Sequence, residues 1–185
     1  MVATDDRIEV VTHITEVLTH VDGVLAIDMP IGLPEAGSRV CDREARRQVG
    51  ARRSSVFPAP SRSALSATTF AETTGLSIQS WNLVPKIREV DDAWQPRMVE
   101  AFPELVFTVL AGAPMTHNKR SPDGHAERLG TLGLTVAPRV PGAAPHDVLD
   151  AIACLRAAHR YAAGTALSLG DDTLDARGRP MRIIA

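Results

Sequence analysis

The chain has 185 residues, of which 44% are hydrophobic and 23% are charged, values typical of one globular domain with a core. Its net charge of −2 excludes an overall basic field, so any surface that binds phosphate must be local. Two cysteines, Cys41 and Cys154, are too few for a disulfide framework or a zinc site. No apolar run is long enough to cross a membrane, and the start lacks the pattern of a signal peptide. We therefore expect a single domain over residues 1–185 in a cytoplasmic protein.

Short apolar or β-branched runs predict strands at Arg7–Val11, Val24–Asp28 and Arg97–Ala101. Helix-forming segments, several of them bounded by Pro or Gly, predict helices at Ile14–His20, Cys41–Gly50, Ala64–Thr73, Gln79–Val90 (with the start near or after Pro85), Pro103–Gly112, Gly124–Leu132 and His146–Ala163. Loops are expected at Arg52–Ser63 and Thr135–Gly142, and a last apolar piece at Met181–Ile184. Strands that alternate with helices indicate an α/β fold, with a largely helical insertion at about residues 35–95.

Asp28 ends an apolar run and precedes a turn marked by Pro30, Gly32 and Pro34. A carboxylate at the exit of a buried strand is costly unless it has a partner. Strand ends in α/β sheets build ligand sites, so one interpretation is that Asp28 holds a metal ion. The alternative is that Asp28 caps the turn by accepting hydrogen bonds from backbone N–H groups. The spacing alone favours neither.

Two further acids are candidates for the same site. Asp150 falls on the apolar side of the helix His146–Ala163, where an acid needs a partner. The alternative for Asp150 is a capping arrangement in which Asp147 is the N-cap and Asp150 the third helical residue. Glu104 follows the strand Arg97–Ala101 and suits the positive end of the next helix.

Seven sequence blocks then point, by their shared order, to one known family. They are AIDMPIGLP (Ala26–Pro34), CDREAR (Cys41–Arg46), RRSSVFPAP (Arg52–Pro60), LSIQSWNLVPKIREVD (Leu76–Asp91), VEAFPELVF (Val99–Phe107), NKRSPDGHAERL (Asn118–Leu129) and DVLDA (Asp147–Ala151). From about Val21 to Ala185 the chain resembles the predicted nucleases with an RNase H-like fold that are catalogued as domain of unknown function 429.

The resemblance implies an RNase H-like mixed sheet flanked by helices, with acids at the strand ends that hold Mg²⁺ or Mn²⁺ and cleave phosphodiesters of nucleic acid. Asp28, Glu104 and Asp150 are then the expected catalytic and metal-binding residues. Basic residues in the blocks are candidates for phosphate contacts, namely Arg52, Arg53, Lys86, Arg88, Lys119 and Arg120. The alternative for these is a solvated surface, or helical pairs such as Lys86 with Glu89. We also expect the segment Arg39–Lys86 to line the same cleft as Asp28.

The chain departs from the family pattern at two places. The family usually begins with a strand that bears Val-Asp-Gly, followed by a second strand, and nothing before Arg7 is expected to supply them. We therefore expect missing N-terminal strands, an exposed sheet edge through which homo-oligomers form, and weak or absent activity. The family also commonly has His-Pro-Glu where this chain has Phe102-Pro103-Glu104. Two alternatives to a nuclease follow: a catalytically incomplete binding or interaction protein on this scaffold, or a small-nucleotide phosphohydrolase.

Overall fold

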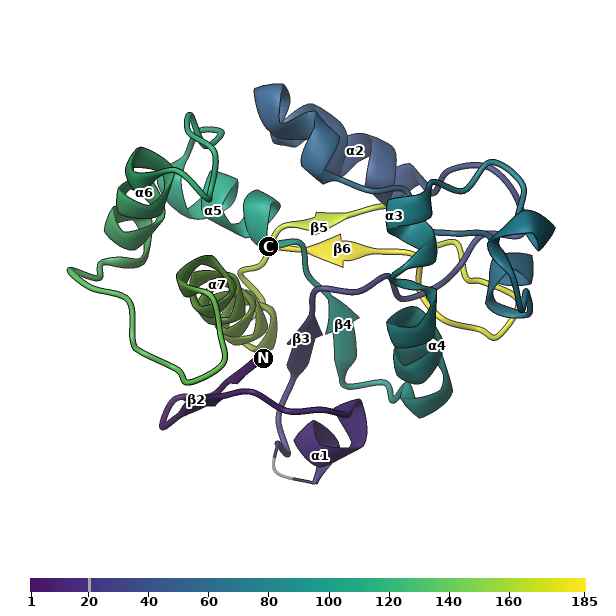
Figure 1. The fold of residues 1–185 in the computed structure, drawn as a ribbon, viewed down its shortest axis with the longest axis horizontal. Coiled ribbons are helices and arrows are strands. Elements are labelled where there is room, and N and C mark those ends of the chain that lie inside the picture. The colour runs from purple at the N-terminus through teal and green to yellow at the C-terminus, as the bar shows by residue number, and fades with distance from the viewer. Residues whose placement is uncertain (20) are drawn as a thin grey trace.

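The computed structural model describes residues 1–19 and 21–185 and shows a mixed α/β fold with short strands (Figure 1). The strands form three pairs: β1 (Val2–Ala3) antiparallel with β2 (Ile8–Glu9), β3 (Leu25–Ile27) parallel with β4 (Met98–Glu100), and β5 (Ser168–Leu169) antiparallel with β6 (Ile183–Ile184). An isolated parallel bridge between Ala101 and Ile184 joins β4 to β6. Pairing at the centre of the molecule therefore runs in the order β3, β4, β6, β5.

The helices surround these strands (Figure 1). They are α1 (Ile14–Leu18), α2 (Val40–Gln48), α3 (Ile78–Trp81), α4 (Val84–Ala93), α5 (Pro103–Ala111), α6 (Pro122–Leu132) and α7 (Pro145–Ala162), with 3₁₀ turns η1 (Gly50–Ser55), η2 (Arg62–Leu65) and η3 (Phe70–Glu72). Both α5 and α6 begin at a proline, which suits the first helical position. Each ends at a glycine in the left-handed region, with φ of 73° at Gly112 and 71° at Gly133. None of these helices, as far as the chain is described, is long and apolar enough to span a bilayer.

Two apolar clusters meet at β3. The larger cluster lies between α5 and α7 and contains Phe107, Leu149 and Ala153, all fully buried. The smaller cluster lies between α1, α4 and the strands, and it includes Leu25. Because side chains alternate along a strand, Leu25 faces the smaller cluster while Ala26 packs against the larger one. β3 is therefore held on both faces, and Asp28 leaves the sheet at its carboxyl end.

The predicted helix Ala64–Thr73 is wrong, because the chain makes two separate turns, η2 and η3, in this region. The carboxylate of Glu72 accepts hydrogen bonds from the backbone N–H of Thr68 (2.8 Å) and from the hydroxyl groups of Thr68 and Thr69. Local side-chain bonds of this kind compete with the helical backbone ladder. The expected loop Arg52–Ser63 also contains regular turns, because it includes the end of η1 and the start of η2.

Three other boundaries differ from expectation. Within Gln79–Val90 the helix α4 begins at Val84, near Pro85 as expected, but a separate short helix, α3, which Ser77 caps, precedes it. A two-residue strand, β1, does precede Arg7 and pairs with β2, although residues 1–7 do not contain the Val-Asp-Gly motif of the family. The helix predicted at Ile14–His20 ends at Leu18 as α1, and His20 lies outside the described residues.

Arg39, at the start of α2, forms a buried ion cluster with Asp42 and Glu100. Its guanidinium donates to both oxygens of Glu100 (2.6 and 2.8 Å) and to both oxygens of Asp42 (2.6 and 3.1 Å). It also donates to the carbonyl oxygens of Ile31 and Gly32 in the turn after β3. Burial alone would lower the pKa of Arg39, but the two carboxylates outweigh burial and hold the pKa well above its ordinary value. The cluster ties α2 and β4 to the turn that follows Asp28.

We predict that Arg39→Met destabilises the fold by about 3–5 kcal/mol, because it leaves two buried carboxylates without their counter-ion. Urea unfolding followed by circular dichroism measures the change. The matched control is Arg47→Met, which removes an exposed arginine from the same helix and should cost no more than about 0.5 kcal/mol. Equal unfolding midpoints for the two variants would show that the cluster does not hold the fold together.

Candidate active site

Asp28 stands directly after β3 and is exposed to solvent. Within the described chain, its carboxylate has no hydrogen-bond or ion-pair partner, so the turn-capping alternative finds no support. Asp28 also lines a recess in the surface, and the Asp28 side chain remains accessible to solvent there. Its oxygens are therefore free to accept a ligand.

Asp150 projects from α7 and pairs with Lys119 from the loop before α6, with 2.5 Å between Lys119 Nζ and Asp150 Oδ2. The side chain of Asp150 is 13% exposed and that of Lys119 is 37% exposed. The capping alternative for Asp150 is wrong: α7 begins at Pro145 after the N-cap Ala144, so Asp147 lies in the first turn. Asp150 therefore sits inside the helix and takes its partner from another element.

The two aspartates influence each other's charge. Partial loss of hydration in the recess, and next the negative charge of Asp150, raise the pKa of Asp28 to about 7. Burial also raises the pKa of Asp150, against the opposing effect of Lys119. Lys119 likewise opposes the upward shift at Asp28. The structure thus brings Asp28, Asp150 and Lys119 into one electrostatic site at the end of β3, beside α7.

Glu104 has a different environment. Both of its oxygens accept hydrogen bonds from Nη2 of Arg128, at 2.9 and 2.7 Å, and both side chains are buried. The guanidinium of Arg128 also lies over the ring of Phe107, 5.4 Å from its centroid. This pair joins α5 to α6, and it engages both carboxylate oxygens of the predicted ligand Glu104.

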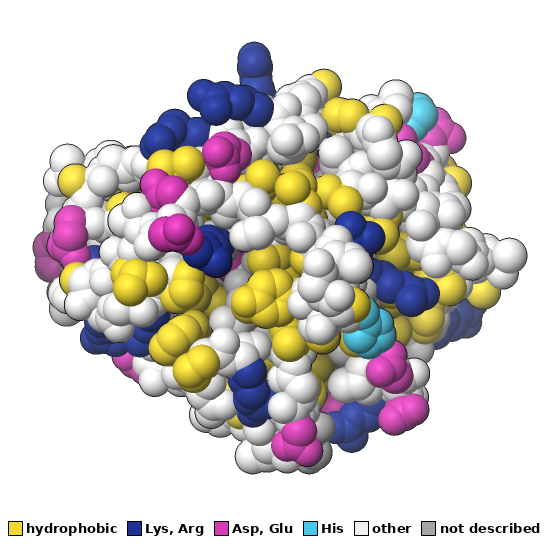
Figure 2. All heavy atoms as spheres, turned by 180° about the vertical axis from the view of Figure 1, so that it is seen from behind, with side chains coloured by type: hydrophobic (Ala, Val, Ile, Leu, Met, Phe, Trp, Pro, Cys, Tyr) yellow, Lys and Arg dark blue, Asp and Glu magenta, His cyan; other side chains and the backbone are white. Residues whose placement is uncertain are grey.

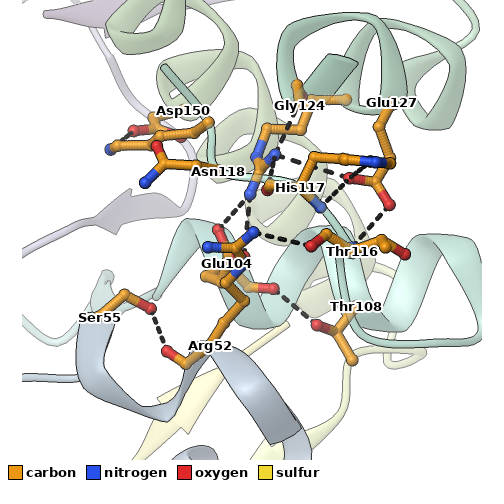
Figure 3. A network of polar contacts seen from close by, with 12 residues as sticks. Arg52, Ser55, Glu104, Thr108, Thr116, His117, Asn118, Gly124, Glu127 and Asp150 are labelled. Carbon is orange, nitrogen blue, oxygen red and sulfur yellow. Dashed lines mark hydrogen bonds and ion pairs between the residues drawn. The ribbon is translucent and has the colours of Figure 1, made fainter. Parts of the chain in front are cut away.

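The loop that carries Lys119 is held by side chains from two elements, α6 and η1 (Figure 3). The carboxylate of Glu127 on α6 accepts hydrogen bonds from the N–H groups of Thr116 (2.7 Å) and His117 (3.0 Å). Arg52 donates to the carbonyl of Thr116 at 2.8 Å, and Arg128 donates to the carbonyl of His117 at 3.2 Å. These bonds fix the backbone just ahead of Lys119.

Gly124 lets this loop approach α6 closely. A Cβ atom at position 124 would overlap the carbonyl oxygen of Asn118. Ser121 supports the same approach, because its hydroxyl donates to that carbonyl at 2.8 Å and also accepts from the N–H of Gly124. The close packing sets where the residue after Asn118, Lys119, leaves the loop.

Two of the other predicted phosphate ligands make hydrogen bonds to backbone carbonyl groups of the chain. Arg52 is engaged with Thr116, and Arg88 donates to the carbonyl oxygens of Leu65 and Ala67 rather than pairing along its helix. Arg53, Lys86 and Arg120 are exposed. Figure 2 shows basic, acidic and apolar side chains mixed on the rear face rather than one continuous basic patch. Of the six predicted basic ligands, Lys119 is the one that contacts an acid of the site.

The recess beside Asp28 encloses a cavity of about 80 Å³. Most of its wall is apolar, and the segment Arg39–Lys86 supplies much of it, including Val56, Phe57, Pro58, Pro60 and Leu83. The expectation that this segment lines the same cleft as Asp28 is confirmed, and the residues that it contributes are mostly apolar, together with Asp42 and Ser80. Phe57, 45% exposed, and the half-buried Phe102 both line the recess. Sequence reasoning noted the blocks that contain these two aromatic residues but gave the residues no role.

The site can bind a cation or a polar hydrogen on the free carboxylate of Asp28, an anion on the exposed part of Lys119, and an apolar group in the recess. Over residues 1–19 and 21–185, no group of three His, Cys, Asp or Glu side chains converges to hold a metal ion. The negative charges of Asp150, Glu100 and Asp147 all act on Asp28, with Asp150 the strongest of the three, and Glu104 is kept with Arg128.

Fold and site together define a mixed α/β protein with one aspartate, Asp28, at the end of a parallel strand pair and another, Asp150, on the helix that packs against it. The chain belongs to the family described as "Protein of unknown function (DUF429)", whose model matches residues 1–175. The match begins at residue 1, whereas the motif blocks alone indicated a start near Val21. No curated protein and no solved structure matches the chain.

We predict that Asp28→Asn stabilises the protein at about pH 8 but leaves its stability near wild type at about pH 4. The pKa of Asp28 is raised from 3.8 to about 7 on folding, so between these values the folded chain holds a proton that the unfolded chain has lost. The contribution of Asp28 to the free energy of unfolding therefore falls as the pH rises from about 4 to about 7. Asn cannot ionise, so the variant does not lose this stability. Thermal unfolding at both pH values measures the effect.

The matched control for this experiment is Asp22→Asn, which removes an exposed acid just ahead of β3. Its effect on the melting temperature should not change between the two pH values. A melting-temperature difference between Asp28→Asn and wild type that stays constant with pH would contradict the raised pKa of Asp28.

Proposed function

We propose that this chain is a metal-dependent hydrolase of the RNase H-like class that acts on phosphodiesters of nucleic acid, with Mg²⁺ or Mn²⁺ held by Asp28 and Asp150. The observation that carries the proposal is that Asp28 follows β3, which packs against the helix α7 that carries Asp150, so that the charge of Asp150 acts on Asp28, and the carboxylate of Asp28 has no partner in the described chain. Carboxylates that share a site repel each other unless a cation or a proton intervenes.

The donor set is compatible with such an ion. Mg²⁺ prefers hard oxygen ligands and is commonly bound through one or two carboxylates, with water and substrate phosphate completing its coordination. Two aspartates meet that requirement even though no third acid joins them in the described chain. When bound, the ion would supply charge stabilisation at the phosphate and a more acidic water molecule.

The chain's own residues supply the remaining functions of the proposed site. The partly exposed ammonium of Lys119 can contact a phosphate oxygen, since a lysine binds phosphate as a point charge. The recess lined by Phe57 and Phe102 offers an apolar surface beside the acids, suited to the sugar or base next to the phosphate. Asp28, with its pKa raised to about 7, can hold or release a proton near neutral pH.

A non-catalytic binding protein is the second candidate. The observation that favours it is the bidentate pairing of Glu104 with Arg128, which engages the third predicted acid and leaves two at the site. Under this alternative, the site would bind a phosphate-containing ligand through Lys119 and would not cleave it. A hydrolysis assay separates the two candidates directly.

We predict that the chain cleaves fluorescently labelled single-stranded DNA or RNA when Mn²⁺ is supplied, and that Asp28→Asn and Asp150→Asn each lower the rate by about 100-fold or more, because each removes a direct ligand. Gel or fluorescence assays measure the rates, and a nucleoside monophosphate ester serves as the small-substrate comparison. Asp22→Asn, an exposed acid outside the site, should cleave like wild type.

Cleavage of the small ester alone would assign the chain to nucleotide hydrolysis instead of nuclease activity. Binding of the oligonucleotide without cleavage, in Mg²⁺ and in Mn²⁺, would favour the non-catalytic candidate. Equal rates for wild type and both aspartate variants would remove the site from the reaction.

A further inference from the structure

Lys119 is the cation that the fold supplies to the aspartate pair. Its Nζ lies 2.5 Å from Oδ2 of Asp150, and its charge also opposes the upward pKa shift at Asp28. Figure 3 shows Asp150 beside Asn118, at the edge of the polar network that includes Arg52 and Glu104. One ammonium group therefore partly neutralises both carboxylates.

The position of Lys119 is built rather than incidental. The backbone ahead of it is bonded by Glu127, Arg52 and Arg128, which come from α6 and η1. Behind it, Ser121 caps α6 and bonds back to Asn118. A surface lysine usually loses side-chain freedom when it forms an ion pair and gains little from the pair. Here the backbone is already fixed and Asp150 is largely buried, so the pair is stronger than an exposed one.

Resting on the proposed function, we propose that Lys119 and a divalent cation are competing partners of Asp150. Lys119 occupies the Oδ2 oxygen of Asp150. An ammonium at this distance repels a second cation that approaches the same carboxylate. The ion must therefore displace Lys119 from Asp150, and its affinity is reduced by the strength of that ion pair. The displaced ammonium is then available to a substrate phosphate.

The test measures binding of Mn²⁺ alone, by electron paramagnetic resonance of the free ion and by the rise in melting temperature that Mn²⁺ causes. Lys119→Met keeps a long apolar side chain and removes the charge, so it should bind Mn²⁺ about tenfold more tightly than wild type, as expected for a pair of intermediate burial. Lys119→Arg keeps the charge and should bind Mn²⁺ about as wild type does.

Two controls separate local competition from a general change of charge. Arg156→Met removes an exposed cation from α7 itself and should leave Mn²⁺ affinity unchanged. In an Asp150→Asn background the competition no longer exists, so adding Lys119→Met should give no tightening. Circular dichroism confirms that each variant is folded before binding is measured.

Unchanged or weaker Mn²⁺ binding by Lys119→Met would overturn the proposal, as would equal tightening by Arg156→Met or an absence of Mn²⁺ binding at millimolar concentration in every variant. These outcomes are distinct from failure of the hydrolase proposal. If Lys119→Met tightens Mn²⁺ binding and no substrate is cleaved, the competition stands and the proposed activity fails. If wild type cleaves nucleic acid and Lys119→Met binds Mn²⁺ as wild type does, the competition alone fails.

Discussion

The buried guanidinium of Arg39 is the interaction on which the arrangement around the site depends. It contacts a helix through Asp42, a strand through Glu100 and a turn through the carbonyl of Ile31. Glu100 in turn accepts a hydrogen bond from the N–H of Ile31. Both the N–H and the carbonyl of Ile31, in the turn after Asp28, are therefore hydrogen-bonded by the cluster. A buried charge is tolerated only when its partners satisfy it fully. Here the partners of Arg39 lie in α2, in β4 and in the turn after β3, so the guanidinium holds these three segments together. Removing the cation would therefore loosen three elements at once.

Arg128 holds Glu104 in a similar way, although its buried Nε has no hydrogen-bond partner in the described chain. Each arginine takes up both oxygens of a glutamate, so Glu100 and Glu104 serve the framework. The aspartates are treated differently, since Asp28 has no partner in the described chain and Asp150 has a partly exposed lysine. This difference follows from the chemistry of the basic partners. A planar guanidinium can hold both oxygens of a carboxylate in one geometry, whereas a flexible ammonium contacts a carboxylate as a single point charge. The acids left free or weakly held are those that the site can use.

Local pattern predicted the parts of the fold that local forces decide. α5, α6 and α7 were predictable because proline, glycine and apolar periodicity mark their ends and their buried faces. The segment Ala64–Thr73 was not, because the bonds from Glu72 that divide it depend on hydroxyl geometry rather than on helix propensity. Asp28 and Asp150 stood out as acids in apolar surroundings, a signal that sequence carries. The partner of Glu104 lies 24 residues away and that of Glu100 lies 61 residues away, and no local pattern reports such pairs.

Gly124 shows how far the requirements of the site extend from its charges. It carries no functional group, and its backbone conformation is one that any residue adopts, yet a methyl group there would strike the carbonyl of Asn118. The loop would have to move outward, and the lysine that follows Asn118 would move with it. In a scan of random substitutions, position 124 would then score among the sensitive positions for reasons of space alone. A sensitive position in such a scan is therefore not in itself evidence of a residue that touches the ligand.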